Sequence, residues 1–234
     1  MLEVSNLSVG YGDIIAVRGL SFSISPGKIM ALMGANGAGK SSTLMSLMGL
    51  VEHKSGVVMM DGEDISGMPA EARISKGLAI VPEGRRIFPD LSVHENLIVG
   101  GHIVSRETMT QGIETVYSYF PQLADRQKQA AGSLSGGEQQ MLAMGRALIS
   151  QPALLIIDEL SLGLMPKIVD ECYAVLEKLK TDNVGILLVE QNTGRAISVA
   201  DDVCVLEAGN LIWAGTAKEA CNDASFTNKL IGLN

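Results

Sequence analysis

The chain has 234 residues, which is near the upper range for one domain and enough to bury a large core. Hydrophobic residues make up 47% and charged residues 19%, and this composition excludes a disordered chain. The net charge of -8 argues against a surface for nucleic acid or anionic lipid, so no nucleic-acid partner is expected. No apolar run reaches the roughly 18 residues of a membrane-spanning helix.

The cysteines and histidines show no metal-ligand spacing, which excludes a zinc site and indicates a reducing, cytosolic compartment. The first residues lack a basic segment followed by an apolar stretch, so no signal peptide is expected.

Strand patterns dominate the first part of the chain. The first 30 residues alternate between apolar and polar, and Pro26-Gly27 marks a turn. Residues 28–33 form a compact apolar run, which precedes a glycine-rich loop and a helical stretch to about Leu50. Further on, Asp61-Gly62 predicts the turn of a β-hairpin.

Helical and strand patterns alternate in the rest of the chain. Residues from about 85 to 147 are mostly helical, apolar strand-like runs return at 153–157 and 185–189, and Gly209-Asn210 predicts a final hairpin turn. Buried strands that alternate with helices indicate an α/β fold with a mainly parallel sheet. We expect one domain over residues 1–234, with an antiparallel β subdomain at the N-terminus and an inserted α-helical lobe at about 85–147.

Residues 34–41 read GANGAGKS and match the phosphate-loop pattern GxxxxGK[ST] between an apolar strand and a helix. This motif predicts a P-loop NTPase with a RecA-like core. The backbone N–H groups of such a loop surround phosphate oxygens, and the helix dipole favours their charge. Lys40 is expected to reach the β- and γ-phosphates, and the Ser41 hydroxyl to ligate Mg²⁺. The expected ligands are therefore ATP and Mg²⁺, and the residues expected around the nucleotide are Gly34, Ala35, Asn36, Gly37, Ala38, Gly39, Lys40, Ser41 and Ser42.

Asp158 and Glu159 directly follow one of the apolar strands. Ligands of open α/β sheets bind outside the carboxyl ends of the strands, where these two side chains are expected to lie. Asp158 is expected to hold Mg²⁺ through water, and Glu159 to orient and polarise the attacking water. An acidic pair after a strand is weak evidence alone, but with the phosphate loop it predicts nucleotide hydrolysis.

Residues 134–140 read LSGGEQQ and resemble the LSGGQ signature of ABC ATPases, about twenty residues before the acidic pair. Ser135, Gly136 and Gly137 at a helix start form a second anion-binding turn. In the family this turn caps the γ-phosphate held by the opposite subunit. A helix capping box made by Ser135 and Glu138 explains the same residues. Both interpretations hold together, because the cap builds the turn.

The resemblance to ABC ATPases covers essentially the whole chain. The stretches VPEGRRIFPDLSVHENL, LSGGEQQMLAMGRAL, SLGLMPKIV and VEQN resemble the second ATPase of branched-chain amino-acid uptake systems. This resemblance implies the ATP-hydrolysing subunit of an importer for branched-chain or hydrophobic amino acids, with urea or short amides as the alternative substrate. A kinase or GTPase would not explain residues 134–140. A non-transport ABC protein usually carries two ATPase halves or a long inserted arm, and this chain has neither.

The resemblance also implies partners and a location. The ATPase would pair head to tail with a paralogue or a second copy, and would bind transmembrane permease subunits through residues from 85 to about 103. A periplasmic or extracellular substrate-binding protein would be an indirect partner. The protein would lie on the cytoplasmic side of the cell (inner) membrane, held there by the permeases. Residues 161–164 fall where the family contacts the partner ATPase.

Further site residues follow from the same resemblance. Tyr11 matches the aromatic residue that stacks on adenine, with ordinary packing as the alternative, and Val17 would line the same face. Glu83 stands where most members have the glutamine that senses Mg²⁺ and the γ-phosphate. Gln191 stands where most have the switch histidine. The amino-acid subgroup commonly shows both changes, so we interpret them as tuning of catalysis.

Leu160 is a third departure, because family members usually carry proline after the acidic pair. Proline fixes φ and would stiffen the turn. Leucine is therefore expected to loosen the placement of Glu159 and to affect the hydrolysis rate, without affecting nucleotide binding.

Overall fold

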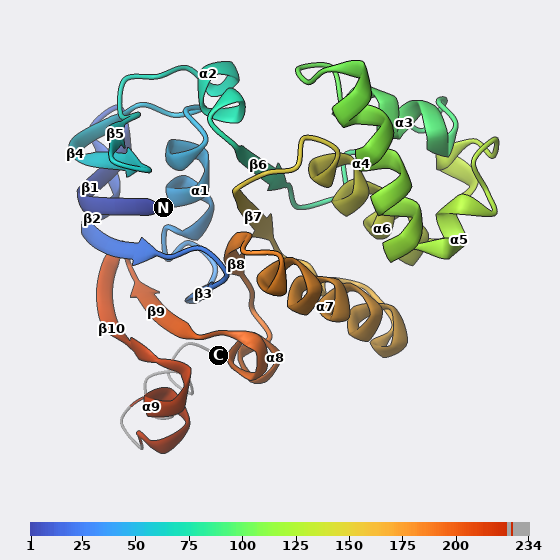
Figure 1. Cartoon of the computed structure of the whole chain (residues 1–234). Helices are drawn as coiled ribbons and strands as arrows, with labels where there is room; N and C mark the ends of the chain where they lie inside the picture. Colours follow the sequence, from blue (N-terminus) through green and yellow to red (C-terminus); the bar gives the residue numbers. More distant parts are fainter. Residues whose placement is uncertain (224–225, 227–234) are drawn as a thin grey trace.

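The computed structural model describes residues 1–223 and Phe226, which form two sheets with α1 (Lys40–Leu47) between them (Figure 1). The four-stranded sheet is antiparallel and has the order β2-β1-β4-β5, with β1 (Leu2–Tyr11), β2 (Ile14–Ile24), β4 (His53–Met60) and β5 (Glu63–Asp64). The six-stranded sheet has the order β10-β9-β3-β8-β7-β6. Its strands are β3 (Ile29–Met33), β6 (Leu78–Val81), β7 (Leu154–Asp158), β8 (Gly185–Val189), β9 (Asp202–Glu207) and β10 (Asn210–Thr216). All pair in parallel except β10, which is antiparallel to β9 at the edge.

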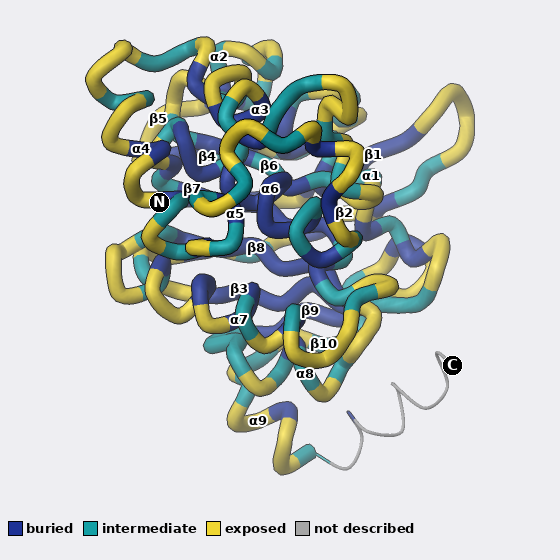
Figure 2. Tube along the Cα trace, turned by 90° about the vertical axis from the view of Figure 1, so that its right-hand side faces the viewer, coloured by how far each residue is buried: buried dark blue, intermediate teal, exposed yellow. Residues whose placement is uncertain are grey.

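The central strands are buried on both faces. In β7, Leu155 and Ile157 face the helical lobe and α7 (Pro166–Thr181), whereas Leu154 and Ile156 face α1 and the antiparallel sheet. Successive side chains of a strand point to opposite faces, so a strand covered on both sides consists of one continuous apolar run. Figure 2 shows these strands as buried and the outer loops as exposed.

A helical lobe lies to one side of the parallel sheet (Figure 1). It contains α3 (Val93–Gly100), α4 (Arg106–Tyr119), α5 (Pro121–Ala124), the short 3-10 helix η1 (Ala131–Ser133) and α6 (Gly136–Leu148). Serine side chains cap the three longer helices at Ser92, Ser105 and Ser135. The helical pattern thus begins at 93 rather than at 85. Residues 82–92 form an irregular loop, in which Arg85 and Arg86 have φ of 65° and 47°.

Two tight turns join neighbouring strands. The hairpin predicted at Asp61-Gly62 is confirmed, and both turn residues have positive φ, 50° and 81°. The final hairpin is also present, but its turn residues are Ala208 and Gly209, one position earlier than predicted. Asn210 is not in the turn because it pairs with Glu207 in the β9–β10 ladder.

The remaining helices are α2 (Ala70–Ser75), α8 (Thr193–Val199) and α9 (Ala217–Asn222). Within the part of the chain that the structure describes, no helix has both the length and the apolar character needed to cross a membrane.

Candidate nucleotide site

The phosphate loop between β3 and α1 is shaped by its glycines. Gly34, Gly37 and Gly39 have φ of 152°, 80° and 106°, a region that other residues rarely adopt. A Cβ at Gly34 would lie 2.3 Å from the Leu206 carbonyl oxygen, and one at Gly39 would lie 2.7 Å from the Ala16 carbonyl oxygen. Gly39 offers no capping side chain to α1, so the first N–H groups of this helix are left for an anion.

Lys40 is the buried cation of this loop. Its side chain is 5% exposed, and its Nζ donates hydrogen bonds to the carbonyl oxygens of Gly34 (2.8 Å) and Ala35 (3.1 Å). The lysine therefore lies folded back over the loop that is expected to hold phosphate. This position puts its charge at the centre of the phosphate cradle.

Carboxylates surround Lys40. Burial, with smaller contributions from Glu83 and Glu159, raises the pKa of Asp158 to about 6, and Lys40 partly opposes this shift. Burial lowers the pKa of Lys40, while Glu159, Asp158 and Glu83 act in the opposite direction. The crowding of like charges around Asp158 is unfavourable for its ionised form, and a bound cation would relieve it.

The described residues form no cluster of three or more histidine, cysteine or carboxylate side chains arranged to hold a metal ion. Mg²⁺ is usually bound by one or two carboxylates together with substrate phosphates and water, rather than by a cage of protein groups alone. The arrangement of Ser41, Glu83 and Asp158 beside the phosphate loop fits that mode.

A cavity of about 560 Å³ opens beside the phosphate loop. It brings together residues from the loop, from the ends of β6 and β7 and from the segment after β8. Its lining consists of Ala16, Asn36, Gly37, Gly39, Lys40, Ser41, Ser42, Glu83, Glu159, Leu162 and Gln191. Residues that the sequence placed far apart therefore meet at the carboxyl end of the parallel sheet, as expected.

Of the two residues expected around adenine, Val17 lies differently from expectation, whereas the role of Tyr11 stays a prediction. Val17 is fully buried in the core and packs against the phosphate loop, since its Cγ2 would lie 2.8 Å from a Cβ at Gly39. Its neighbour Ala16 lines the cavity instead, because adjacent side chains of β2 point to opposite faces. Tyr11 is half exposed at the end of β1, where it pairs with Ile14.

Glu159 is held at the cavity wall by the last residue of β8 and by Gln191, which follows β8. Its φ is 54°, and its backbone N–H donates to the Val189 carbonyl oxygen at 2.9 Å. The Gln191 side chain donates from Nε2 to Asn36 Oδ1 at 3.0 Å and also to Glu159 Oε1. Gln191 thus joins the phosphate loop to the carboxylate expected to act on water.

Leu160 occupies the core. It is fully buried and belongs to the apolar cluster on the helical side of the sheet. Core packing therefore holds the turn where a proline was expected, which opposes the loosening inferred from the sequence.

Glu190 is a residue of this region that the sequence analysis missed. Its side chain is 2% exposed, and it accepts hydrogen bonds from Ser161 and Tyr173. A carboxylate placed immediately after the wholly apolar strand β8 was the signal that could have revealed it.

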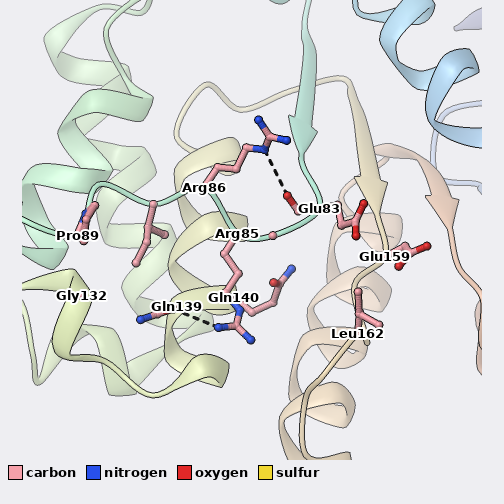
Figure 3. A pocket seen from close by; sticks show the side chains of 11 residues that line it. Glu83, Arg85, Arg86, Pro89, Gly132, Gln139, Gln140, Glu159 and Leu162 are labelled. Atoms are coloured by element: carbon pink, nitrogen blue, oxygen red, sulfur yellow. Dashed lines mark hydrogen bonds between the residues drawn. The ribbon is translucent and has the colours of Figure 1, made fainter.

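A second cavity of about 540 Å³ lies between the loop after β6 and the helical lobe. Figure 3 shows Arg85 and Arg86 extending in different directions from this loop. Arg85 Nη1 donates to Gln139 Oε1 at 3.2 Å, whereas Arg86 Nε donates to the Glu83 carbonyl oxygen at 3.4 Å. The Arg85 guanidinium also packs on Gly136, where a Cβ would lie 2.9 Å from Nη2.

The signature turn, residues 135–137, lines neither of these two cavities. The predicted capping box is confirmed, because Ser135 Oγ accepts from the Glu138 N–H at 3.3 Å and Glu138 Oε2 accepts from the Ser135 N–H at 2.8 Å. Arg126 Nε forms an ion pair with Glu138 Oε1 at 3.0 Å. The turn is thus well ordered within its own chain.

A family model described as ABC transporter matches residues 17–161. The chain belongs to the ABC transporter family. As a member it is an ATP-binding subunit that hydrolyses ATP, as the phosphate loop and acidic pair predicted.

Relatives and solved structures agree with this assignment over the full length. The chain is 41% identical over 232 residues to the high-affinity branched-chain amino acid transport ATP-binding protein BraG of Pseudomonas aeruginosa, covering 99% of this chain and 100% of the relative. It is 35% identical over 234 residues to the probable branched-chain amino acid transport ATP-binding protein LivF of Archaeoglobus fulgidus, covering 100% and 99%. A solved ATP-binding subunit of an ABC transporter superposes with a TM-score of 0.87 at 26% identity, covering 99% and 98%. The predicted fold class is thereby confirmed.

Proposed function

We propose that this chain binds ATP with Mg²⁺ at the phosphate loop and hydrolyses it to power the uptake of branched-chain or other hydrophobic amino acids. The substrate assignment is supported by the full-length similarity to two ATPases named for branched-chain amino acid transport. We further propose that residues 1–234 work as one ATPase domain with the helical lobe as an insertion.

The observation that carries the hydrolysis mechanism is the convergence of Lys40, Glu159 and Gln191 on one cavity. Lys40 would exchange its loop carbonyl partners for β- and γ-phosphate oxygens, which bind an ammonium more strongly because they are charged. Ser41, Glu83 and Asp158 would hold Mg²⁺, which neutralises charge on the phosphates when bound. Tyr11 would stack on adenine at the rim.

Glu159 would take the proton of the attacking water. Its carboxylate lies at the cavity wall, and the Gln191 amide, which also contacts Asn36, restrains it there. A base so restrained needs little reorganisation when the water attacks.

Glu159→Gln tests this role. The amide still fits but cannot act as a base, so we expect ATP binding to persist while hydrolysis stalls. Nucleotide affinity and turnover should be measured on the same preparation, with the exposed Glu207→Gln as a matched control. Hydrolysis by Glu159→Gln at the wild-type rate would exclude Glu159 as the base.

The partner ATPase would close the nucleotide cavity. Residues 135–137 line neither of these two cavities of their own chain. The Ser135 N–H is bonded to Glu138, and the N–H groups of Gly136 and Gly137 at the start of α6 suit an anion brought by another chain. Leu162, which lines the cavity and is 55% exposed, offers apolar surface beside the site, and Met165 at the start of α7 is 71% exposed. A head-to-tail pair of this chain with a paralogue or a second copy would enclose both nucleotides.

Permease subunits would bind a groove between the helical lobe and the core. A cavity of about 250 Å³ lies partly on the segment that the sequence analysis assigned to this contact, and Phe88, Val99, His102, Ile103 and Arg146 are among its lining residues. Phe88 is 44% exposed, with the Arg146 guanidinium carbon 5.0 Å from its ring centroid. The groove therefore combines apolar surface with one cation, which suits an amphipathic helix of a partner.

Cysteines introduced at Val99 or His102 should cross-link to a permease loop in the assembled transporter. A cysteine at the exposed Glu114 on α4 is the control. If no groove position cross-links while the complex stays intact, the coupling surface lies elsewhere.

Uptake assays of the assembled transporter distinguish transport of amino acids from transport of urea or short amides. Omission of the extracellular substrate-binding protein from the same assay tests that indirect partner.

A further inference from the structure

The Glu190 carboxylate is buried and fully engaged. Oε1 accepts from the Ser161 backbone N–H at 2.8 Å and from the Tyr173 hydroxyl at 3.3 Å, and Oε2 accepts from the Ser161 hydroxyl at 2.9 Å. Burial of a carboxylate is unfavourable unless hydrogen-bond donors surround it. The Ser161 and Tyr173 donors therefore stabilise the Glu190 carboxylate, and the carboxylate in turn holds these donors in place. Ser161 alone supplies one bond to each oxygen, and this geometry restrains both the place and the orientation of the residue.

Ser161 belongs to the turn that presents Glu159. Three consecutive residues hold this turn, the last of β8 and the two that follow it: Val189 accepts the Glu159 N–H, Glu190 accepts from Ser161, and Gln191 donates to the Glu159 side chain. Glu159 has a φ of 54°, a conformation that residues with a side chain adopt rarely. Such a conformation persists only where the surrounding contacts determine it.

Apolar packing of the turn does not replace these bonds. Leu160 is fully buried and fixes the depth of the turn, but a non-directional contact leaves the rotation of the neighbouring peptides free. Directional hydrogen bonds to the N–H and hydroxyl of the next residue remove that freedom.

We propose that Glu190 is a positioning residue for ATP hydrolysis, whose carboxylate fixes the turn after β7 so that Glu159 faces the nucleotide cavity. The inference rests on the proposed role of Glu159 as the base. It adds a residue that contacts neither cavity but acts on the reaction through Ser161.

The other side of the carboxylate is fixed by helices. Tyr173 lies on α7, and burial together with Glu190 raises the pKa of its hydroxyl, so the hydroxyl remains a donor. The guanidinium carbon of Arg195 on α8 lies 6.0 Å from the Tyr173 ring centroid. Glu190 therefore ties the catalytic turn to α7, a helix that packs in the core.

Three variants of the full-length chain test the proposal with Mg²⁺ and ATP. Glu190→Met keeps the size and burial but removes both acceptors, and we expect kcat to fall by roughly 10- to 100-fold, the scale for a misplaced catalytic group, with ATP affinity within about twofold of wild type. Glu190→Gln can still accept from the Ser161 N–H and donate to its hydroxyl, and should restore kcat to within about threefold. Tyr173→Phe removes a donor to the same carboxylate without touching the turn, and should stay close to wild type.

Hydrogen exchange provides a readout that does not depend on catalysis. Amides of residues 159–164 should exchange faster in Glu190→Met than in wild type, while those of β7 remain protected. If Glu190→Met does not fold, Ser161→Ala carries the same test, because it removes the hydroxyl bond and leaves the carboxylate with its other donors.

Wild-type kcat together with unchanged exchange in Glu190→Met, or in Ser161→Ala where that variant replaces it, would overturn the proposal. An equal loss of kcat in Tyr173→Phe would also overturn it, since the carboxylate would then serve general packing. Failure of the underlying function is separable: a fully active Glu159→Gln removes the base assignment, whereas faster exchange at 159–164 would still show that Glu190 holds the turn.

Discussion

The phosphate loop and the signature turn both place glycines at the start of a helix, yet their helix ends are satisfied differently. Gly39 gives α1 no side-chain cap, whereas Ser135 and Glu138 cap α6 reciprocally. The phosphate loop also lines a cavity together with residues from three strand ends, and the signature turn lines neither cavity beside it. One turn is thus built into a cavity of its own chain, and the other is an ordered turn that lies outside both of these cavities.

The charges around the two turns differ as well. Carboxylates of Glu83, Asp158 and Glu159 act on Lys40, so the phosphate loop combines a cation with excess negative charge. Beside the signature turn the nearest charged group to Gly136 is the Arg85 guanidinium. The charges around the phosphate loop suit a nucleotide that binds together with Mg²⁺. The charge beside the signature turn suits the terminal phosphate of a nucleotide that another chain holds. Variants can separate the two regions.

Lys40→Ala should have the largest effect. It removes the cation that lines the nucleotide cavity, the only one among the residues that the structure describes, and we expect ATP binding or turnover to be abolished. Affinity and hydrolysis should be measured together, with the exposed Lys54→Ala as control. Unchanged values for both would contradict the site assignment.

Ser135→Arg should block hydrolysis and leave ATP binding by the same chain nearly intact. The bulky cation would prevent closure over a partner's nucleotide, while the phosphate loop is untouched. Ser92→Arg is a matched control, because Ser92 caps α3 with the same kind of box. Loss of a cap alone costs about 1 kcal/mol of stability.

Mixing Ser135→Arg with Lys40→Ala protein should restore at most one of two shared sites. Normal hydrolysis by Ser135→Arg alone would show that the site is not shared between chains.

Arg85→Ala should have a moderate effect on turnover. The guanidinium contacts Gln139 and Gly136, so it joins the loop of Glu83 to the start of α6. Loss of one such hydrogen bond is expected to slow hydrolysis by up to roughly tenfold at saturating ATP. Arg86→Ala is the paired control, since the Arg86 side chain donates to the Glu83 carbonyl oxygen of its own loop and extends away from Arg85 (Figure 3). Equal effects of both variants would rule out a specific link through Arg85.

In the protein without nucleotide or Mg²⁺, Asp158→Asn should have the smallest of these effects, and that effect is on stability. The folded-state pKa of Asp158 is raised to about 6 from an ordinary value of 3.8, so the stabilising contribution is present at low pH and is lost as the pH rises through 6. We expect the variant to increase the free energy of unfolding by about 1–2 kcal/mol at pH 8, and the difference to shrink towards pH 4. Denaturant unfolding without nucleotide measures it, with the exposed Asp13→Asn as control. A difference independent of pH would contradict the raised pKa.

Several local features could be predicted from the residues alone. The phosphate loop, the Asp61-Gly62 turn and the Ser135–Glu138 capping box were all anticipated, because each conformation depends on a few neighbouring residues. The buried parallel strands were also predictable, since a strand covered on both faces must be apolar throughout. The final hairpin was found, but its turn was placed one residue late.

Other features depend on the packing of distant segments. Ala16 lines the nucleotide cavity and Val17 does not, because adjacent side chains of β2 point to opposite faces. The pairing of β2 with β1 decides which side chain points to which face. Glu190 and Ser161 lie 29 positions apart, and they meet because β7 and β8 are neighbours in the sheet. Sequence reasoning identifies groups with the right chemistry, but the order of strands in the sheet determines which of those groups come within hydrogen-bonding distance.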